Sequence, residues 1–365
     1  MKQKVGIVTL VNFEHNFGNR LQNYALQTVV ERLGFRVETI NDIRCVKHTE
    51  AALIQLLRYL AHYITRYKYV PSIHKAGIRF WLWVKKYRKA TSYTIKKDED
   101  FYSKVDTDKY AFFITGSDQI WRPVFTASSN FACFLQFAPP HKRIAYAPSF
   151  GMKYEDFPED KKVQYTQWLS SGWRALSVRE KSGADAIMKM IHQQVPVVLD
   201  PTMLLTANEW QKIANKRRVP KHYLLVYCLR TNKYLPYAKE LALRNNLEIV
   251  DLNNDDQYSG CNPSDFIYYV SNADCVLTNS FHCNVFSFLF HKQVAYYMSD
   301  DEQTQKISSR IDTLLELTGK QIILNRELTI YPEIDWKLYE ENLSTRRKNA
   351  MKFLYNALKG GTNND

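Results

Sequence analysis

Residues 274–290, DCVLTNSFHCNVFSFLF, contain a complete strand-turn-helix unit. The run at 275–277 is apolar and short, as in a buried strand. From residue 281 onward, phenylalanine, valine and leucine recur at the three- and four-residue spacing of a helix face. The polar residues 278–280 between these two patterns suit a sharp turn. This unit is the building block of an α/β fold, and the remaining segments are compared with it.

The turn in this unit has the chemistry of an anion site. Ser280 suits the N-cap of the helix, which places His282 in the first helical turn. Unpaired backbone N–H groups and the helix dipole favour a phosphate or a carboxylate there. A histidine beside such a ligand can also transfer a proton. Taken alone, the unit is more simply explained as structural, with a hydrogen-bonded histidine.

Length and composition exclude several classes of protein. The 365 residues are 45% hydrophobic and 24% charged, which suits a globular chain of two domains. No apolar run approaches the roughly 20 residues of a bilayer span, and no small-residue cleavage site follows the N-terminal lysines. Six scattered cysteines with no CxxC pair argue against a zinc site and a disulfide framework. We therefore expect a cytoplasmic protein without a bound metal.

The net charge of +13 is concentrated in residues 51–97, which contain eleven basic side chains and no acidic one. Many aromatic residues alternate with these charges, and leucines recur on one helical face. We interpret 51–97 as a helical insertion that contacts an anionic membrane surface peripherally or binds a lipid-linked substrate. A helical segment that only packs on its domain explains the pattern equally well. Nucleic acid is not expected, since no nucleic-acid motif accompanies the charge.

The N-terminus repeats the strand-loop-helix pattern. VGIVTL at 5–10 predicts a strand buried on both faces. Asn16, Gly18 and Asn19 suit a tight loop after it, and the helical spacing that follows ends at Gly34. Ligands of open α/β sheets bind at the carboxyl ends of strands, where the loop after this strand lies. Asn16, Arg20 and Gln22 are therefore candidate binding residues, with hydrogen bonding inside the loop as the alternative.

Two further strand ends present polar residues. YAFFIT at 110–115 runs directly into GSDQIW, which places Asp118 and Gln119 at the end of a buried strand. Asp118 suits a sugar hydroxyl, and Trp121 suits stacking on a pyranose ring. An N-capping aspartate and a core tryptophan are the alternatives. Arg179 follows the apolar run 175–178 and can bind a carboxylate or phosphate, or form a salt bridge with Glu180 or Asp200.

The order of these segments predicts an α/β fold with two domains. About six strands alternate with helical stretches up to residue 207, and the polar, proline-closed segment 208–220 is the expected linker. A second alternating domain spans 221–330, and a basic helix with a tail spans 331–365. Near the end of the second domain, Arg310 lies at a helix start, where the dipole disfavours a cation. An anion bound between Arg310, Lys306 and the helix end would explain it, and a position on the surface explains it equally well.

Seven motifs in this order resemble the polysaccharide pyruvyl transferase family. Members of this family look like two facing Rossmann-like domains, similar to the GT-B glycosyltransferases, with the active site in the interdomain cleft. They transfer the enolpyruvyl unit of phosphoenolpyruvate to a sugar as a ketal and release phosphate. The motifs are NFGNRLQNYALQ, GSDQIW, AYAPSFG, SVRE, VLDPTMLL, TNSFHCNVFSFLF and SSRIDTLLELTG, between about residues 5 and 319.

The resemblance assigns roles residue by residue. His282 matches the histidine of the SFH motif, Arg179 matches the arginine of the SxR(D/E) motif, and Arg310 or Lys306 matches a basic residue of the late loop. Three residues depart from the family pattern. Asn279 replaces an aspartate, which predicts a change in the histidine tautomer, and Cys283 replaces a glycine. Arg122 replaces an asparagine, which predicts a different acceptor sugar.

The resemblance also implies the chemistry. It places the donor phosphate at Ser280, Phe281 and Cys283, with Lys306 nearby, and the donor carboxylate at Arg179 and Arg310. His282 acts as acid-base and Asp118 positions the acceptor. The basic, aromatic segment 51–97 predicts that this acceptor is a lipid-linked oligosaccharide at the inner membrane face. No cofactor is expected beyond the donor substrate. A nucleotide-sugar glycosyltransferase and a non-catalytic carbohydrate or lipid-surface binding protein remain as alternatives. The acceptor-side residues are Asn16, Arg20, Gln22, Gln119 and Trp121.

Overall fold

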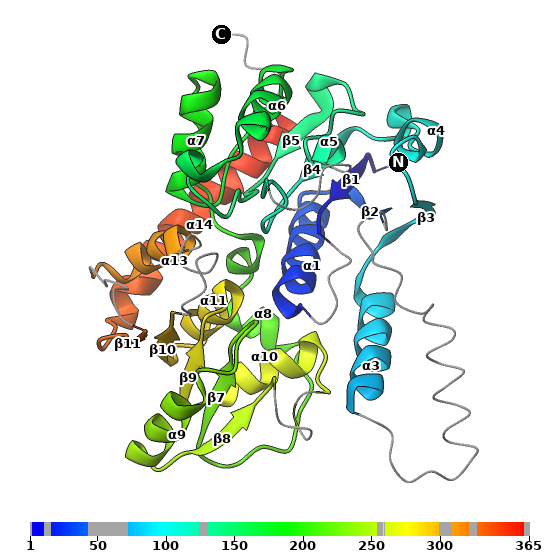
Figure 1. Cartoon of the computed structure of the whole chain (residues 1–365). Helices are drawn as coiled ribbons and strands as arrows, with labels where there is room; N and C mark the ends of the chain where they lie inside the picture. Colours follow the sequence, from blue (N-terminus) through cyan, green and yellow to red (C-terminus); the bar gives the residue numbers. More distant parts are fainter. Residues whose placement is uncertain are drawn as a thin grey trace, which may run out of the picture.

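Two sheets, each covered by helices, form the framework of the protein (Figure 1). The computed structural model describes residues 2–10, 16–42, 72–123, 130–253, 258, 260–298, 308–320 and 327–360. The predicted fold class, α/β with two facing Rossmann-like domains, is confirmed by the topology of these sheets. Lys306 and residues 51–71 of the basic insertion lie outside the described residues.

The first sheet has six parallel strands in the order β3-β2-β1-β4-β5-β6, which is that of a Rossmann fold. The order reverses between β1 and β4, and ligands of such sheets bind outside the carboxyl ends of strands at this point. The strands are β1 (Lys4–Val8), β2 (Arg36–Asp42), β3 (Ala90–Ile95), β4 (Phe112–Thr115), β5 (Arg143–Ala145) and β6 (Ala175–Leu176). The helices of this half are α1 (Phe17–Arg32), α3 (Ser72–Tyr87), α4 (Asp100–Lys104), α5 (Asn130–Cys133), α6 (Glu159–Ser170) and α7 (Lys181–Ile191).

The second sheet has the order β11-β10-β9-β7-β8 and is parallel except for its edge strand β11. The strands are β7 (Tyr223–Tyr227), β8 (Glu248–Asp251), β9 (Cys275–Thr278), β10 (Gln293–Tyr297) and β11 (Leu328–Ile330). The helices are α8 (Ala207–Gln211), α9 (Leu235–Arg244), α10 (Pro263–Asn272), α11 (Phe281–Leu289), α13 (Ser308–Leu315) and α14 (Trp336–Lys359). The unit predicted at 274–290 is therefore β9 followed by α11. Five 3₁₀ turns complete the described elements: η1 (Thr107–Lys109), η2 (Pro140–Lys142), η3 (Tyr154–Asp156), η4 (Pro201–Leu204) and η5 (Glu316–Thr318).

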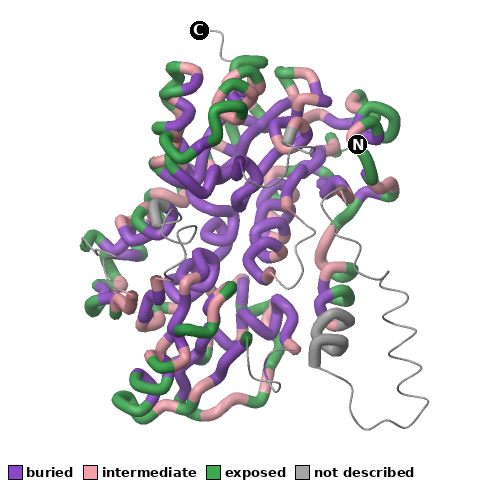
Figure 2. The backbone as a smooth tube through the Cα atoms, viewed as in Figure 1, coloured by how far each residue is buried: buried purple, intermediate pink, exposed green. Residues whose placement is uncertain are grey.

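Helix α1 joins the two halves through apolar contacts. The Asn16 side chain caps this helix by accepting a hydrogen bond from the Asn19 backbone at 3.0 Å. The buried Phe17 ring stacks on Phe266 of α10 at 4.9 Å and lies 5.3 Å from Tyr227 at the end of β7. Burying such a ring stabilises the fold by roughly 1.5–3 kcal/mol. In Figure 2 the buried residues accordingly include both sheets and α1 between them.

The described part of the basic insertion corrects the prediction of a helical segment. Residues 72–87 form α3, but Ala90–Ile95 form β3, the edge strand of the first sheet. The sequence TSYTI alternates and contains β-branched residues, which is a strand signal that the surrounding charge obscured. Helix α3 also reaches the second half, because Trp83 Nε1 donates to Ser264 Oγ at 2.8 Å and Arg79 forms an ion pair with Asp265.

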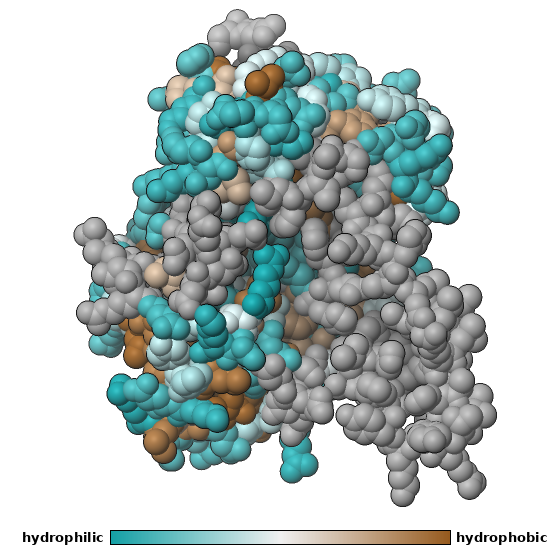
Figure 3. All heavy atoms as spheres, viewed as in Figure 1, coloured by the Kyte–Doolittle hydropathy of each residue, from teal (hydrophilic) through white to brown (hydrophobic). Residues whose placement is uncertain are grey.

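The C-terminal helix α14 returns from the second half to the first (Figure 1). Arg347 donates to the Met203 carbonyl at 2.8 Å, and Arg174 beside β6 donates to the Ala357 carbonyl at 2.6 Å. The expected linker at 208–220 contains most of α8, and the domain boundaries remain predictions. None of the helices in the described ranges combines the length and apolar character of a bilayer span. Figure 3 shows a mainly hydrophilic surface over α6 and α7.

Candidate active site

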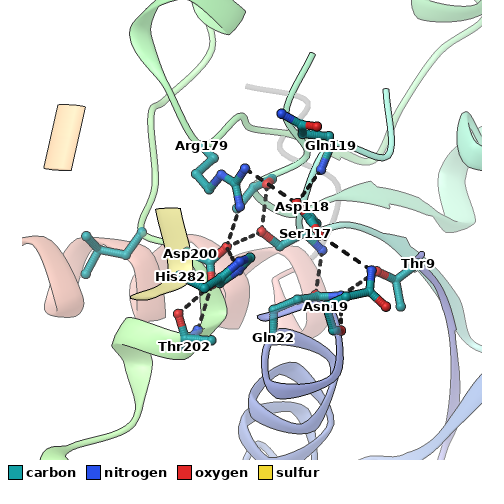
Figure 4. A network of polar contacts seen from close by, with 12 residues as sticks. Thr9, Asn19, Gln22, Ser117, Asp118, Gln119, Arg179, Asp200, Thr202 and His282 are labelled. Atoms are coloured by element: carbon teal, nitrogen blue, oxygen red, sulfur yellow. Dashed lines mark hydrogen bonds and ion pairs between the residues drawn. The ribbon is translucent and has the colours of Figure 1, made fainter. Parts of the chain in front are cut away.

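Polar side chains from both halves meet between the two sheets (Figure 4). The turn after β4 and the first turn of α1 supply one side of this cluster, and η4 and α11 supply the other. Its labelled members are Thr9, Asn19, Gln22, Ser117, Asp118, Gln119, Arg179, Asp200, Thr202 and His282.

His282 belongs to the second half but packs on the first. It lies in the first turn of α11, whose N-cap Ser280 accepts a hydrogen bond from the Cys283 backbone at 3.4 Å. The imidazole lies directly against Gly18 of α1, where a Cβ atom would come within 2.1 Å of His282 Nδ1. Only glycine allows α1 and α11 to approach so closely. The contact therefore fixes the histidine between the two halves.

Asp200 lies beside His282 at the centre of the cluster. Its Oδ2 atom lies 3.5 Å from His282 Nε2 and accepts hydrogen bonds from Ser117 Oγ at 2.7 Å and Arg179 Nη1 at 2.8 Å. Its Oδ1 atom accepts from the backbone N–H and the hydroxyl of Thr202 at 3.0 and 2.7 Å. Burial acts to raise the pKa of Asp200, but the charges of the histidine and the arginine outweigh it, and the pKa is lowered. Asp200 is therefore a fixed negative charge.

Asp118 is displayed by the tight turn after β4. Gly116 opens the turn with φ 126°, and a Cβ atom there would lie 2.0 Å from the Tyr146 carbonyl oxygen. Asp118 has a left-handed backbone with φ 64°, which aspartate tolerates better than most residues. It accepts from the Gln119 backbone at 2.8 Å and from Asn19 Nδ2 at 3.4 Å. Burial acts to raise the pKa of Asp118, but nearby histidine and arginine charges lower it.

Two arginines lie on the Phe281 ring, with Cζ atoms 4.2 Å (Arg179) and 5.7 Å (Arg310) from its centroid. Arg179 is balanced by Asp200 and by Glu180 at 3.7 Å. Burial acts to lower the pKa of Arg179, but these carboxylates raise it. Burial and then repulsion by Arg179 lower the pKa of Arg310 to about 10. Arg310 is thus a buried cation whose charge an anionic ligand would stabilise.

Several buried nitrogen atoms of the cluster have no hydrogen-bond partner within the described part of the chain. They are Arg179 Nε and Nη2, Arg310 Nε and His282 Nε2. The terminal nitrogens of Arg310 lie 3.0 Å from the Gln119 amide, which accepts from them when its oxygen faces the guanidinium. Each unpaired buried donor costs roughly 1–3 kcal/mol. These donors suit anionic oxygens, and both arginines help to line a cavity of about 20 Å³ together with Phe281 and Asp200.

The comparisons with known proteins give the family. The family model described as polysaccharide pyruvyl transferase matches residues 16–301. The chain belongs to the polysaccharide pyruvyl transferase family. It is therefore a transferase, and its family acts in polysaccharide biosynthesis.

Comparison with solved structures finds weak similarity over the whole chain. A putative UDP-N-acetylglucosamine 2-epimerase from Listeria monocytogenes is 10% identical, with a TM-score of 0.48 and coverage of 99% of this chain and 93% of that chain. MnaA of S. aureus with UDP is 11% identical, with a TM-score of 0.46 and coverage of 100% and 92%. Anabaena Alr3699/HepE with UDP and glucose is 10% identical, with a TM-score of 0.43 and coverage of 98% and 94%. No curated protein matches the sequence.

The structure brings together most of the residues predicted for this pyruvyl transferase, but three of them do not have the binding role that was predicted. Trp121 is fully buried, donates to the Cys133 carbonyl at 2.9 Å and stacks on Phe134 at 4.6 Å. Its predicted stacking on a sugar is therefore wrong. Gln22 is also fully buried, and its amide donates to Thr9 and accepts from the Ser117 backbone. Gln22 therefore stabilises the turn after β4 through hydrogen bonds and does not present a free amide to an acceptor.

Cys283 is the third correction. Its side chain is fully buried, burial raises the pKa of its thiol to about 12, and its backbone N–H is already bonded to Ser280. It therefore offers no group to a phosphate. The predicted effect of Asn279 on the histidine tautomer is also not supported, because its amide bonds both backbone groups of Leu229 at 2.7 and 3.1 Å. Asn16 acts as the N-cap of α1, and Arg20 lies on the opposite side of that helix from Gly18.

Sequence reasoning missed the central carboxylate and the glycine. Asp200 was considered only as a salt-bridge partner of Arg179, although the DPT sequence at 200–202 after an apolar run signals a capped turn at a strand end. Gly18 was interpreted as a loop residue, but it lies inside α1 and its contact is with a residue 264 positions later. Within the described residues no group of three or more histidine, cysteine or acidic side chains could hold a metal ion.

Proposed function

We propose that this transferase moves the enolpyruvyl unit of phosphoenolpyruvate onto a sugar of a lipid-linked oligosaccharide and releases phosphate. The observation that supports this most is the pair of arginines flanking Phe281 beside His282, each with a buried nitrogen that has no hydrogen-bond partner among the described residues. Phosphoenolpyruvate has a carboxylate and a phosphate on one carbon. The two guanidinium groups and the imidazole, all beside the Phe281 ring, match that charge distribution.

The donor would bind across Phe281. Arg179 and Arg310 would hold the carboxylate, and the first turn of α11 at Ser280 would face the phosphate. The cavity of about 20 Å³ that both arginines help to line is smaller than phosphoenolpyruvate, so binding requires the side chains or the two halves to move apart.

The reaction needs proton transfers at three points. The methylene carbon of phosphoenolpyruvate gains a proton, and one sugar hydroxyl adds to the neighbouring carbon and loses its proton. The second hydroxyl then displaces phosphate and loses its proton, which closes the ketal. His282 would carry out one or more of these transfers, with the carboxylate of Asp200 stabilising the imidazolium form. Asp118, on the other side of the cluster, would position the acceptor hydroxyls.

The direct test measures phosphate release from phosphoenolpyruvate by the purified protein, with and without an extract of lipid-linked saccharides. We expect release that depends on the acceptor. Arg310→Gln should raise the KM for phosphoenolpyruvate by roughly tenfold to a hundredfold, because it removes a charge-assisted contact. The KM for the acceptor should change little.

Lys181→Gln is the matched control, since Lys181 is exposed and pairs with Glu316. It should leave both constants unchanged. Protection from thermal unfolding by a nucleotide sugar, with neither binding nor turnover of phosphoenolpyruvate, would instead support a glycosyltransferase.

Peripheral membrane contact through α3 is the second part of the proposal. Trp81, Leu82, Lys85 and Lys86 are exposed together on this helix, and Lys85 lies over the Trp81 ring. Exposed apolar and basic residues on one helix face suit the interface of an anionic membrane.

Charge reversal at Lys85 and Lys86 should lower binding to phosphatidylglycerol vesicles by at least about thirtyfold, because each lysine near the surface contributes roughly 1 kcal/mol. Sedimentation with these vesicles and with neutral vesicles measures the change. Charge reversal at Lys161 and Lys162 on α6 is the control. Equal vesicle binding by all three proteins would contradict the role of α3.

A further inference from the structure

A second pair of arginines lies on the acceptor side of the cluster. Arg20 is in the first turn of α1, and its guanidinium lies over the Phe80 ring of α3 at 5.5 Å from the centroid. Its Nε and Nη1 atoms are buried and have no hydrogen-bond partner within the described chain. Arg88 follows α3 and donates to Asn41 Oδ1 at 2.9 Å, while its Nε atom is likewise buried and unpaired.

The positive charge of Arg88 acts on the guanidinium group of Arg20. Burial first, and then the charge of Arg88, lower the pKa of Arg20 to about 9. Neither arginine forms an ion pair with a carboxylate of the described residues, in contrast to Arg179 with Asp200. Two half-buried cations that have no counter-charge among the described residues destabilise the folded chain unless an anion binds beside them.

The first turn of α1 connects this pair to the proposed reaction centre. Successive residues of that turn contact His282 (Gly18), Asp118 (Asn19) and the Phe80 ring (Arg20). Arg20 is therefore one residue from the asparagine that contacts Asp118 and two residues from the glycine that contacts His282.

We propose that Arg20 and Arg88 form a second anion subsite, which binds the phosphate or diphosphate ester at the reducing end of the acceptor sugar. The proposal rests on the proposed function and narrows its acceptor to an activated, phosphorylated saccharide. Donor and acceptor anions would then be held by different arginine pairs, on the two sides of the first turn of α1.

Calorimetric binding of inorganic pyrophosphate tests the subsite without turnover. Saturating phosphoenolpyruvate is present, so that the donor arginines are occupied. Arg20→Gln and Arg88→Gln should each weaken pyrophosphate binding at least tenfold. Arg32→Gln is the matched control, because Arg32 lies on the last turn of the same helix and pairs with Glu209 at 2.6 Å. Unchanged affinity in Arg20→Gln would overturn the proposal.

Acceptor kinetics separate the possible sources of the phosphate. A lipid diphosphate saccharide, a nucleoside diphosphate sugar and a neutral methyl glycoside are compared in wild type, Arg20→Gln and Arg32→Gln. We expect Arg20→Gln to raise the KM of the phosphorylated acceptors at least tenfold and to leave the neutral glycoside and phosphoenolpyruvate unaffected. An equal rise for the neutral glycoside would contradict a phosphate subsite.

Thermal unfolding distinguishes a binding role from a structural one. Removing an unpaired buried charge relieves repulsion, so Arg20→Gln should have a Tm equal to or above that of wild type in the absence of ligand. A lower Tm would indicate that Arg20 supports the fold and would count against the subsite. If no acceptor supports turnover in wild type, the proposed transfer reaction fails, while pyrophosphate binding still decides whether the subsite exists.

Discussion

Replacing His282 by alanine should lower the rate of pyruvyl transfer by about 10²–10⁴-fold, the usual contribution of a positioned acid-base group. The imidazole lies 3.5 Å from Asp200, with its Nε2 atom buried and unpaired. Loss of this group removes the proton transfer but none of the arginines of the donor site. The KM for phosphoenolpyruvate should therefore change far less than kcat, as phosphate release at varied donor concentration would show.

His291→Ala is the matched control. His291 follows the same helix α11, but it is exposed and pairs with Glu340 at 2.9 Å, far from the cluster. Gly18→Ala should displace the His282 side chain, because the new Cβ would overlap the imidazole. A misplacement of about 1 Å can cost roughly 10²-fold in rate. Normal kcat in both His282→Ala and Gly18→Ala would exclude His282 from the chemistry.

The sequence predicted the fold where local pattern and architecture agree. The runs at 5–10, 110–115 and 275–277 are strands β1, β4 and β9, because continuous apolar runs bounded by turns suit parallel sheets. The short strand β3 was missed because its alternation lies inside a basic, aromatic segment whose other part is helical. Local charge concealed a strand that pairs with β2, whose partner residues lie 51 to 53 positions earlier in the chain.

The site was predicted less completely, for a related reason. Residues at strand ends can be identified from one segment, which is why His282, Asp118 and Arg179 were named and lie together. Contacts between the two halves have no such local signal, so neither Gly18 nor the orientation of Asp200 toward the histidine was predicted. The prediction for Trp121 was wrong for the opposite reason. Its position at a strand end is the same as for a binding residue, and only packing against Phe134 shows that it is core.

Asp200→Asn should reduce kcat by about 10²–10⁴-fold while leaving the shape of the cluster nearly unchanged. The amide can still accept from Thr202, but it places no charge behind His282 and offers none to Arg179. The buried arginine then loses its closest carboxylate, which costs about 3–5 kcal/mol when one partner of a buried pair is removed. Glu180 and Asp118, at 3.7 and 3.8 Å from this arginine, reduce that loss.

The pH dependence of stability separates the effect of the negative charge of Asp200 from the effect of its shape. The folded-state pKa of Asp200 lies below the ordinary value of about 3.9, so the carboxylate stabilises the fold fully above that value. This stabilisation decreases as the pH falls below about 4, because the unfolded chain binds the proton first. The difference in unfolding free energy between wild type and Asp200→Asn should therefore be largest near pH 7 and smaller at pH 3. A difference that stays constant over this range in denaturant titrations would show that Asp200 acts through packing alone, and a normal kcat would remove it from the proton-transfer step.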